Sequence, residues 1–313
     1  MKMISVVAPM YNESGVVKQY CERTLNVLSA LENNYEYEIV LVNDGSSDMT
    51  LTEMQQEQRE NPQHISVVSL TRNFGLEGAV QAGLDHARGD AVIVMDADLQ
   101  DPPELIPKLL EEWENGMDVV HAVRTSRVSD SFFKRKTADM YYRLLSGMAG
   151  KVRIPQGAAN YKLLSRKALE ILQILPERNK VFRVTVPYIG LKADCVGYGR
   201  DQRYAGKTKY NIKSMIAYAL DGITSVTVTP LRKIRWAIFV SIFFFLASLL
   251  GAVSTDGVAR LTALIYVGIS MMTIVLSACI AVMAEYLAQV FMEVKARPIS
   301  LTESYQPAKQ KED

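Results

Sequence analysis

Cysteine is scarce in this chain of 313 residues, and the places where it occurs exclude two of its common uses. Cys21, Cys195 and Cys279 lie far apart, and none of them belongs to a Cys-x-x-Cys pair. The sequence therefore predicts neither a disulfide framework nor a zinc site. A reducing compartment fits this cysteine usage.

An excess of charge of either sign is also missing, because 35 basic and 34 acidic residues leave a formal net charge of +1. With 49% hydrophobic residues, this balance excludes a disordered tail and a protein that binds nucleic acid through bulk charge. The glycine-rich signatures of dinucleotide-binding folds and of P-loops are absent as well. Met1 to Pro9 lacks the long apolar core of a signal peptide, so none is predicted.

The chain before residue 230 alternates strand and helix patterns, which is typical of a parallel sheet covered by helices. Gly89 and Gly116 stand where two of the helices should stop. The predicted fold class is therefore α/β and Rossmann-like. We predict five strands, at Ile4–Ala8, Tyr37–Val42, Ile65–Leu70, Asp90–Met95 and Asp118–Val123.

Two long apolar runs follow, Trp236 to Val253 and Leu261 to Ala284, and neither contains a charged residue. As helices they would cover about 27 Å and about 36 Å, close to the roughly 30 Å hydrocarbon core of a bilayer. Since the linker 254–260 is short, we predict a hairpin of two membrane-spanning helices. Two buried helices of a soluble domain are the alternative.

Basic residues flank both outer ends of this hairpin, and the positive-inside rule then places both ends in the cytoplasm. We accordingly expect an inner (plasma) membrane protein whose catalytic domain and two termini are cytoplasmic. The flanking residues are Arg232, Lys233, Arg235, Lys295 and Arg297.

Asp96 and Asp98 directly follow the apolar strand that ends at Met95, and Gln100 comes next. In an open α/β sheet, ligands bind beyond the carboxyl ends of the strands. Carboxylate and amide oxygens suit Mg²⁺ or Mn²⁺, so we predict a metal site there. An EF-hand fits badly because Asp101 occupies the position that requires glycine. A phosphatase motif also fits badly, because Gln100 stands where that family has Thr or Val. A further alternative is that these acids only cap the helix that begins near Pro102.

Polar turns follow the first two predicted strands as well. Tyr11 could cover a base or ribose, and Glu13 and Asp44 could accept hydrogen bonds from ribose hydroxyls or a base N–H. An ordinary turn, with Ser47 or Asp48 capping the next helix, is the alternative for the second segment.

Taken in order along the chain, six segments resemble family 2 glycosyltransferases of the GT-A fold. More narrowly, they resemble the polyisoprenyl-phosphate glycosyltransferases, which include dolichol-phosphate mannose synthase and the bactoprenol glucosyltransferases. The resemblance implies inverting transfer of a sugar from a UDP- or GDP-linked donor to undecaprenyl or dolichyl phosphate. The segments are Pro9–Glu13, Asn43–Ser46, Thr71–Gly75, Asp96–Pro103, Arg203–Tyr210 and Pro230–Arg232.

The same resemblance implies roles for single residues. Asp96, Asp98 and Gln100 would surround Mg²⁺ or Mn²⁺, and Asp98 is expected to be catalytic. Arg124 and Arg135 would hold the acceptor phosphate, since arginine makes bidentate phosphate contacts; a solvated surface position is the alternative for single arginines. The nucleotide sugar would be bound by Pro9, Tyr11, Asn12, Glu13, Asp44, Asp96, Arg203 and Lys209.

Two segments, residues 132–148 and 211–223, combine neighbouring cations with apolar stripes at helical spacing. Such helices suit a membrane interface with anionic lipid, and packing on the catalytic core is the alternative. We therefore expect a catalytic domain at residues 1–210, a juxtamembrane segment at 211–233, the two spans within 234–284 and a cytoplasmic tail at 285–313. The tail looks flexible from Arg297 onward.

The chain departs from the family pattern at three positions, Leu76, Val184 and Asn160. Asn160 stands where the family generally has an aspartate, and an asparagine side chain cannot take up a proton. A phosphate acceptor needs no strong base, because its second pKa lies near 6. Asn160 is therefore compatible with glycosylation of a prenyl phosphate, in which it would act through hydrogen bonds.

Two other classes of function stay open. One is a processive polysaccharide synthase of the same superfamily, although Lys233–Trp236 lacks the glutamine of its Gln-x-x-Arg-Trp segment. The other is a non-catalytic membrane scaffold. The expected partners are the nucleotide-sugar donor, the polyprenyl-phosphate acceptor and the membrane, with no nucleic acid. A homo-oligomer, a flippase and a downstream glycosyltransferase are open further partners.

Overall fold

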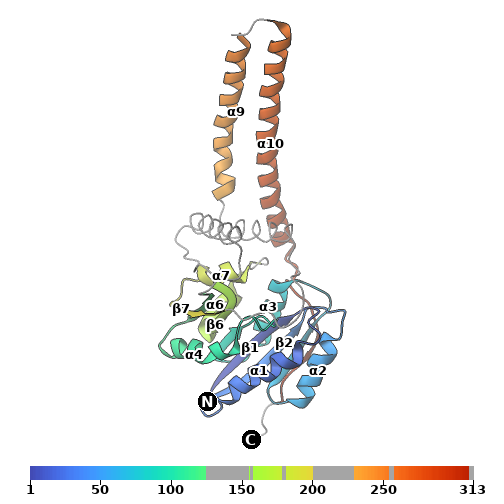
Figure 1. Ribbon diagram of the computed structural model, residues 1–313, viewed down its shortest axis with the longest axis vertical. Coiled ribbons are helices and arrows are strands. Elements are labelled where there is room, and N and C mark those ends of the chain that lie inside the picture. The colour runs from blue at the N-terminus through green and yellow to red at the C-terminus, as the bar shows by residue number, and fades with distance from the viewer. Residues whose placement is uncertain (125–154, 156–157, 178–180, 200–228, 254–256, 310–313) are drawn as a thin grey trace. The chain divides into compact units, whose positions relative to one another are not determined.

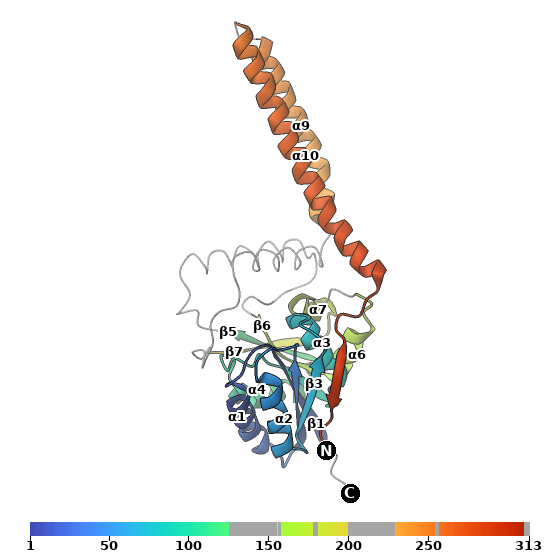
Figure 2. The same cartoon turned by 90° about the vertical axis from the view of Figure 1, so that its right-hand side faces the viewer.

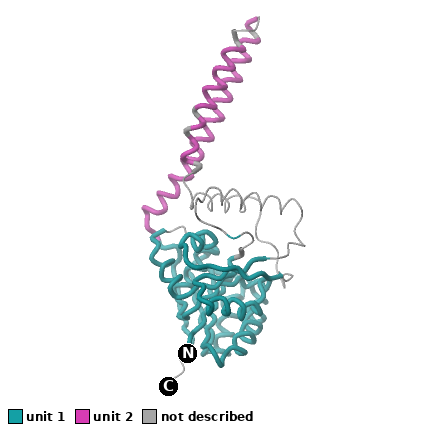
Figure 3. Tube along the Cα trace, turned by 90° about the vertical axis from the view of Figure 1, so that its left-hand side faces the viewer, with its two compact units in different colours: residues 1–219, 298–313 teal, residues 220–297 magenta. Residues whose placement is uncertain are grey.

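The computed structural model describes residues 1–124, 155, 158–177, 181–199, 229–253 and 257–309. The chain divides into two compact units (Figure 3). Unit 1 comprises residues 1–219 and 298–313 and contains the sheet, whereas unit 2 comprises residues 220–297 and contains two long helices.

Unit 1 is built around one eight-stranded sheet with the strand order β7-β5-β6-β4-β1-β2-β3-β8 (Figure 1). All five predicted strands are confirmed, as β1 to β5. The strands are β1 (Lys2–Met10), β2 (Tyr35–Asn43), β3 (Ile65–Leu70), β4 (Ala91–Val94), β5 (Val119–Arg124), β6 (Ala158–Ser165), β7 (Ala193–Tyr198) and β8 (Thr302–Gln306).

The direction of two strands differs from the prediction of a parallel sheet. β1 pairs in parallel with β2 and β4, β2 with β3, and β5 with β7, whereas β6 runs antiparallel to both β4 and β5, and β8 antiparallel to β3. The five predicted strands are thus parallel to one another, whereas β6 and β8, which were not among the predicted strands, make the sheet mixed. Strand direction depends on where a long connection returns the chain, which local sequence pattern does not encode.

Helices cover both faces of the sheet because its strands are apolar on both sides. Val6 of β1 belongs to the core cluster under α1, α2 and α4, while its neighbour Val7 belongs to the cluster under α3, α6 and α7. These helices are α1 (Val17–Ser29), α2 (Thr50–Glu60), α3 (Leu76–His86), α4 (Ile106–Glu114), α6 (Arg166–Ile174) and α7 (Phe182–Tyr188), with the short η1 (Pro103–Leu105) before α4.

The two glycines predicted as helix stops have different roles. Gly116 follows the last residues of α4 with φ +91°, so it terminates that helix in the left-handed conformation as predicted. Gly89 instead lies against β1, where an added Cβ would sit 2.5 Å from the backbone nitrogen of Ser5. The reason for glycine at position 89 is therefore close packing.

Unit 2 consists of α9 (Thr229–Val253) and α10 (Val258–Lys295), which lie side by side (Figures 1 and 2). By length and composition, Leu231–Gly251 and Arg260–Lys295 can each cross a membrane. Small residues let the helices approach closely: the Ser248 hydroxyl donates to the Leu264 carbonyl at 2.6 Å, and an added Cβ at Gly268 would lie 2.6 Å from Ser248 Oγ.

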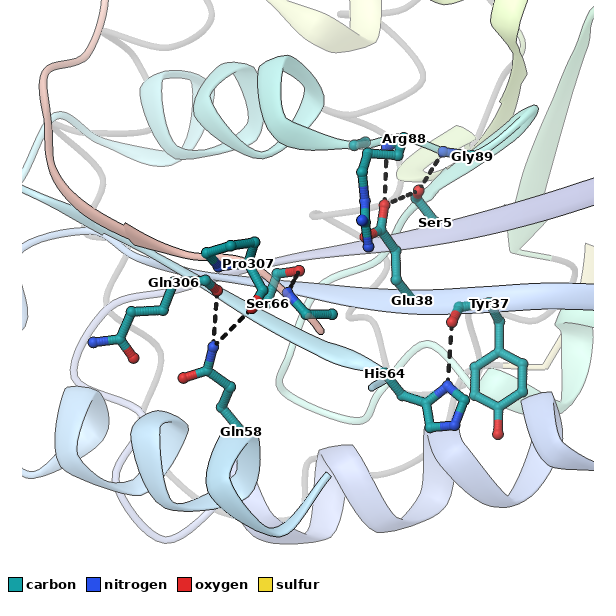
Figure 4. Close-up of polar contacts among 12 residues, drawn as sticks. Ser5, Tyr37, Glu38, Gln58, His64, Ser66, Arg88, Gly89, Gln306 and Pro307 are labelled. Atoms are coloured by element: carbon teal, nitrogen blue, oxygen red, sulfur yellow. Dashed lines mark hydrogen bonds and ion pairs between the residues drawn. The ribbon is translucent and has the colours of Figure 1, made fainter. Parts of the chain in front are cut away.

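The segment after α10 returns to the sheet. β8 pairs with the exposed edge of β3, and Gln58 of α2 donates to the Gln306 carbonyl at 2.9 Å (Figure 4). Beyond the strand, the Ala308 N–H donates to Ser66 Oγ at 3.1 Å. The prediction of a flexible tail is wrong for these residues. An edge strand pairs through its backbone, so a polar segment such as Thr302–Gln306 carries no apolar signal of its position.

Candidate functional site

The carboxyl ends of β1, β2, β4 and β5 and the amino end of β6 lie at one edge of the sheet. The β4–β6 ladder ends with Val94 opposite Lys162, and Asp96 and Asn160 each lie two residues beyond this pair at the same end of the ladder. The β5–β6 register pairs His121 with Lys162, and Arg124 ends β5. The β5–β6 register then shifts so that Val123 pairs with Ala158, and Arg124 lies by the start of β6 rather than opposite Asn160.

The Asp-x-Asp loop has an unusual backbone. Both aspartates are partly buried, and the Gln100 N–H donates to Asp98 Oδ1 at 3.1 Å. Leu99, between Asp98 and Gln100, has φ +56°, which is uncommon for a leucine, and its side chain is only 2% exposed. Neither η1 nor α4 has a side-chain cap, so the helix-capping alternative for these acids is wrong.

Three carboxylates of this loop, Asp96, Asp98 and Asp101, lie close enough that the other two affect the pKa of Asp96. Burial raises the pKa of Asp96 to about 7, and the negative charges of Asp101 and then Asp98 add to the effect. Excess negative charge on hard oxygen atoms is the environment in which a divalent cation binds. Within the described residues, no group of three His, Cys, Asp or Glu side chains could hold a metal alone. Asp96, Asp98 and Gln100 therefore stay predicted ligands, and a metal ion there would need further ligands from a bound anion or water.

The loops after β1 and β2 are joined by hydrogen bonds. Asn12, at φ +51°, donates its N–H to Ser46 Oγ at 3.0 Å and accepts the Ser47 N–H on its side chain at 2.8 Å. The Glu13 N–H donates to Thr50 Oγ1 at 2.9 Å. Tyr11 is 38% exposed, whereas Pro9 is buried. The polar turns predicted from sequence thus form one structure.

Asp44 connects this structure to a third loop. Its carboxylate is 3% exposed and accepts the N–H groups of Phe74 at 2.7 Å and Gly75 at 3.0 Å. Burial raises the pKa of Asp44 to about 6 despite these hydrogen bonds. Asp44 therefore positions the Thr71–Gly75 loop, and its predicted contact with the nucleoside stays a prediction. Asp48 accepts the Thr50 N–H at 3.0 Å within this turn. The N-cap of α2 is Met49 and has no side-chain cap, so the alternative in which Ser47 or Asp48 caps this helix is not confirmed.

Sequence reasoning missed two residues that hold Arg124. The Arg124 Nε–H donates to the Tyr198 hydroxyl at 3.2 Å, the Tyr198 hydroxyl donates to Asp101, and a terminal nitrogen of Arg124 lies 3.5 Å from Asp101 Oδ1. Tyr198 lies opposite Arg124 in the β5–β7 ladder. β7 was not among the predicted strands, so no sequence signal identified Tyr198, whereas Asp101 belongs to the Asp96–Pro103 motif.

Two buried polar groups lie on the same face of β6. Asn160 is 3% exposed and Lys162 is 0% exposed. Neither Asn160 Oδ1 nor Lys162 Nζ has a hydrogen-bond partner within the described part of the chain, and Lys162 Nζ lies 4.5 Å from the centre of the Phe182 ring. Burial, and then Arg183, lowers the pKa of Lys162 to about 7. An unpaired buried acceptor such as Asn160 Oδ1 is suited to a ligand hydroxyl.

The structure thus brings together Pro9, Tyr11, Asn12, Glu13, Asp44, Asp96, Asp98, Gln100, Arg124 and Asn160 at the carboxyl edge of the sheet. Three predicted residues, Arg135, Arg203 and Lys209, lie outside the described residues, as do the two predicted interface helices. Of the family departures, Leu76 begins α3 and Val184 is a buried residue of α7.

Close relatives of the chain carry glycosyltransferase names. It is 37% identical to an uncharacterized glycosyltransferase, YkcC, of Bacillus subtilis over 96% of this chain and 93% of that protein. It is 36% identical to the bactoprenol glucosyl transferase of Shigella phage SfX over 96% of this chain and 99% of that protein. A homologue in Escherichia coli with a corresponding name is 36% identical over 94% of this chain and 96% of that protein.

The fold is that of GT-A enzymes. A glucosyl-3-phosphoglycerate synthase from Mycobacterium tuberculosis, solved with Mn²⁺ and UDP, matches 72% of this chain and 77% of that chain at a TM-score of 0.53 and 20% identity. The family model for glycosyl transferase family 2 matches residues 5–172, which cover β1 through α6 and include the Asp-x-Asp loop. The chain therefore belongs to glycosyl transferase family 2, and it is a glycosyltransferase of GT-A fold.

Proposed function

We propose that this enzyme transfers a sugar from a UDP- or GDP-linked donor to the phosphate of a polyprenol, with inversion and with Mg²⁺ or Mn²⁺. The observation that carries the proposal is that one chain combines a family 2 catalytic unit with two apolar helices of spanning length. Over 94% or more of its length it also matches proteins named bactoprenol glucosyl transferases. A lipid acceptor explains why catalytic and apolar parts occur together.

Divalent metal ions in such sites neutralise the charge that develops on a leaving diphosphate. Asp96 and Asp98, with Gln100, would hold the ion, and the Mn²⁺ in a solved structure of the same fold supports this choice. Tyr11, Asn12, Glu13 and Asp44 would bind the nucleoside, since they lie on the joined loops of β1 and β2.

In the proposed reaction, an oxygen of the lipid phosphate attacks the anomeric carbon while the bond from that carbon to the diphosphate breaks. Arg124 would bind and orient the acceptor phosphate, which is already largely dianionic at neutral pH. Asn160 of β6, which lies at the same edge of the sheet as the Asp96 loop, would accept a hydrogen bond from the transferred sugar. No protein base is required, because no hydroxyl proton has to be removed from the acceptor.

The membrane arrangement belongs to the same proposal. Both apolar helices would span the inner membrane, with the catalytic unit and both ends of the chain in the cytoplasm. The basic flanks of the helices support this orientation, since Lys295 ends α10, Arg297 follows it, and Arg232 and Lys233 lie near the start of α9. A homo-oligomer, a flippase and a downstream glycosyltransferase stay open as partners.

The test is a transfer assay with the purified full-length protein in detergent. Polyprenyl phosphate, Mg²⁺ or Mn²⁺ and a panel of radiolabelled UDP- and GDP-sugars are incubated with the enzyme, and label in the organic phase is counted. Label transfer with one donor supports the proposal and names that donor. Donor hydrolysis alone, or no reaction with any donor, would contradict it and favour the processive or scaffolding alternative.

Replacement of Asp98 by Ala should abolish transfer, and a chelator should do the same to the wild type. The reason is that each change removes the positive charge beside the leaving diphosphate. Asp85→Ala changes an exposed carboxylate on α3 and serves as the matched control. Full turnover of the Asp98→Ala variant would refute the metal assignment.

A further inference from the structure

We propose that Tyr198 and Asp101 are positioning residues for Arg124 and fix its guanidinium for the lipid phosphate. This inference rests on the proposed function, and it assigns roles to two residues that are not themselves expected to touch the substrate. It starts from the hydrogen bonds that join the ends of β5 and β7 to the loop after β4.

The contacts use both sides of the Tyr198 hydroxyl. Its oxygen accepts the Arg124 Nε–H at 3.2 Å, and its own proton goes to Asp101 Oδ1. Burial and then the charge of Asp101 raise the pKa of Tyr198, so the hydroxyl keeps its proton at neutral pH. Asp101 also lies 3.5 Å from a terminal nitrogen of Arg124, so each of the three side chains contacts the other two.

Asp101 and Tyr198 form the buried side of this three-residue cluster, and Arg124 forms its accessible side. The side chain of Asp101 is 1% exposed, and Tyr198 is 5% exposed, whereas the side chain of Arg124 remains 26% exposed. An arginine that is anchored through Nε and one terminal nitrogen keeps N–H groups for an anion. Preorganised donors of this kind lower the cost of binding, because the side chain is already ordered.

The same contacts link the predicted binding site of the acceptor phosphate to the loop predicted to hold the metal beside the donor diphosphate. Asp101 follows Gln100 in the Asp-x-Asp loop, so the residue that anchors the acceptor arginine belongs to the loop that would hold the metal. Tyr161 of β6 holds the next residue of this loop, since its hydroxyl donates to the Pro102 carbonyl at 3.1 Å. Its ring packs edge-on against Tyr198 with 6.0 Å between the centroids.

Tyr161 provides a matched control for Tyr198. Both are buried tyrosines that hold the same loop, but the Tyr161 hydroxyl donates to the Pro102 carbonyl, whereas the Tyr198 hydroxyl accepts from Arg124 and donates to Asp101. Tyr198→Phe and Tyr161→Phe each delete one hydroxyl and keep the ring. A merely structural role would therefore give both variants similar behaviour in the assay.

The experiment measures kcat and KM of the full-length enzyme for polyprenyl phosphate and for the nucleotide sugar. Tyr198→Phe should raise the KM for polyprenyl phosphate roughly tenfold, the scale on which loss of a supporting hydrogen bond acts. In Tyr198→Phe, the KM for the nucleotide sugar should change less than about twofold. In Tyr161→Phe, the KM values for polyprenyl phosphate and for the nucleotide sugar should both change less than about twofold. Asp101→Asn, which keeps the shape and removes the charge, should also raise the acceptor KM.

A double-mutant cycle tests whether Tyr198 acts through Arg124. In an Arg124→Ala background, adding Tyr198→Phe should cause no further loss of acceptor affinity. An equal effect of Tyr198→Phe in both backgrounds, or an unchanged acceptor KM in Tyr198→Phe with wild-type thermal stability, would overturn the inference while leaving the proposed function intact. A wild type that transfers no sugar to polyprenyl phosphate would overturn both.

Discussion

Single residues in this protein combine roles that the sequence pattern separates. Asp44 was predicted to face a nucleoside, yet its two carboxylate oxygens accept backbone N–H groups from Phe74 and Gly75. Asp101 stands inside a recognisable motif, but the hydroxyl that joins it to Arg124 belongs to Tyr198 of β7, 74 residues beyond Arg124 in sequence. Motif membership therefore identified the region, and tertiary contacts decided the role.

Asp44→Asn should destabilise the catalytic unit. The asparagine side chain has one acceptor oxygen, and its NH₂ group would face a backbone N–H, so one hydrogen bond is lost and two donors meet. The expected loss is about 1–3 kcal/mol in the free energy of unfolding. Denaturant unfolding of the purified variant measures it, with Asp85→Asn as the exposed control; equal stability of both variants would contradict the structural role.

Lys162→Met should stabilise the protein at pH 7, and the gain should shrink toward pH 10.5. Burial lowers the pKa of Lys162 to about 7 from its usual 10.5. Between these values the unfolded chain binds the proton and the folded chain does not, so the contribution of Lys162 to stability rises with pH. The other charges near it, Arg183, Glu77 and Asp96, are present in both proteins.

Thermal unfolding at several pH values compares the wild type with Lys162→Met. Near neutral pH the midpoint should be a few degrees higher for the variant, a shift on the scale of about 1 kcal/mol. Lys167→Met, at an exposed position early in α6, is the control. A difference between Lys162→Met and the wild type that is constant from pH 7 to pH 10.5 would show that burial does not depress this pKa.

At the scale of elements, the strands that position the site were predictable only in part. β1 to β5 have apolar runs and adjacent turns, so local pattern identifies them. β6 is apolar as well, but its direction and its place between β4 and β5 follow from long-range pairing. That placement brings Asn160 to the same edge of the sheet as Asp96 and Arg124, which no local pattern could show.

The C-terminal strand should matter for the stability of the catalytic unit. Truncation after Leu301 removes β8 and leaves the β3 edge without its partner, and unpaired edges promote aggregation. We expect a lower thermal midpoint and increased light scattering on heating. Truncation after Lys309, which retains β8, is the control. Identical melting of the two truncated proteins would show that β8 does not stabilise the sheet.

For the whole molecule, the proposed topology makes an accessibility prediction. In a variant whose three native cysteines are replaced, Val258→Cys at the start of α10, next to the short connection, should react with a membrane-impermeant maleimide in intact cells. Glu303→Cys, just inside β8, should react only after permeabilisation. Both positions are exposed in their own units, so burial does not explain a difference. Labelling of both cysteines in intact cells would contradict a cytoplasmic catalytic unit.

The sequence by itself determined the family, the Asp-x-Asp loop, the first five strands and the two apolar helices. Each of these depends on residues that are close in sequence, where hydropathy period and motif spacing are visible. Only the tertiary structure decided the antiparallel direction of β6, the return of the tail to the sheet and the anchoring of Arg124 by Tyr198 and Asp101. These depend on pairings between distant segments, and the residues involved have no shared local pattern that would predict them.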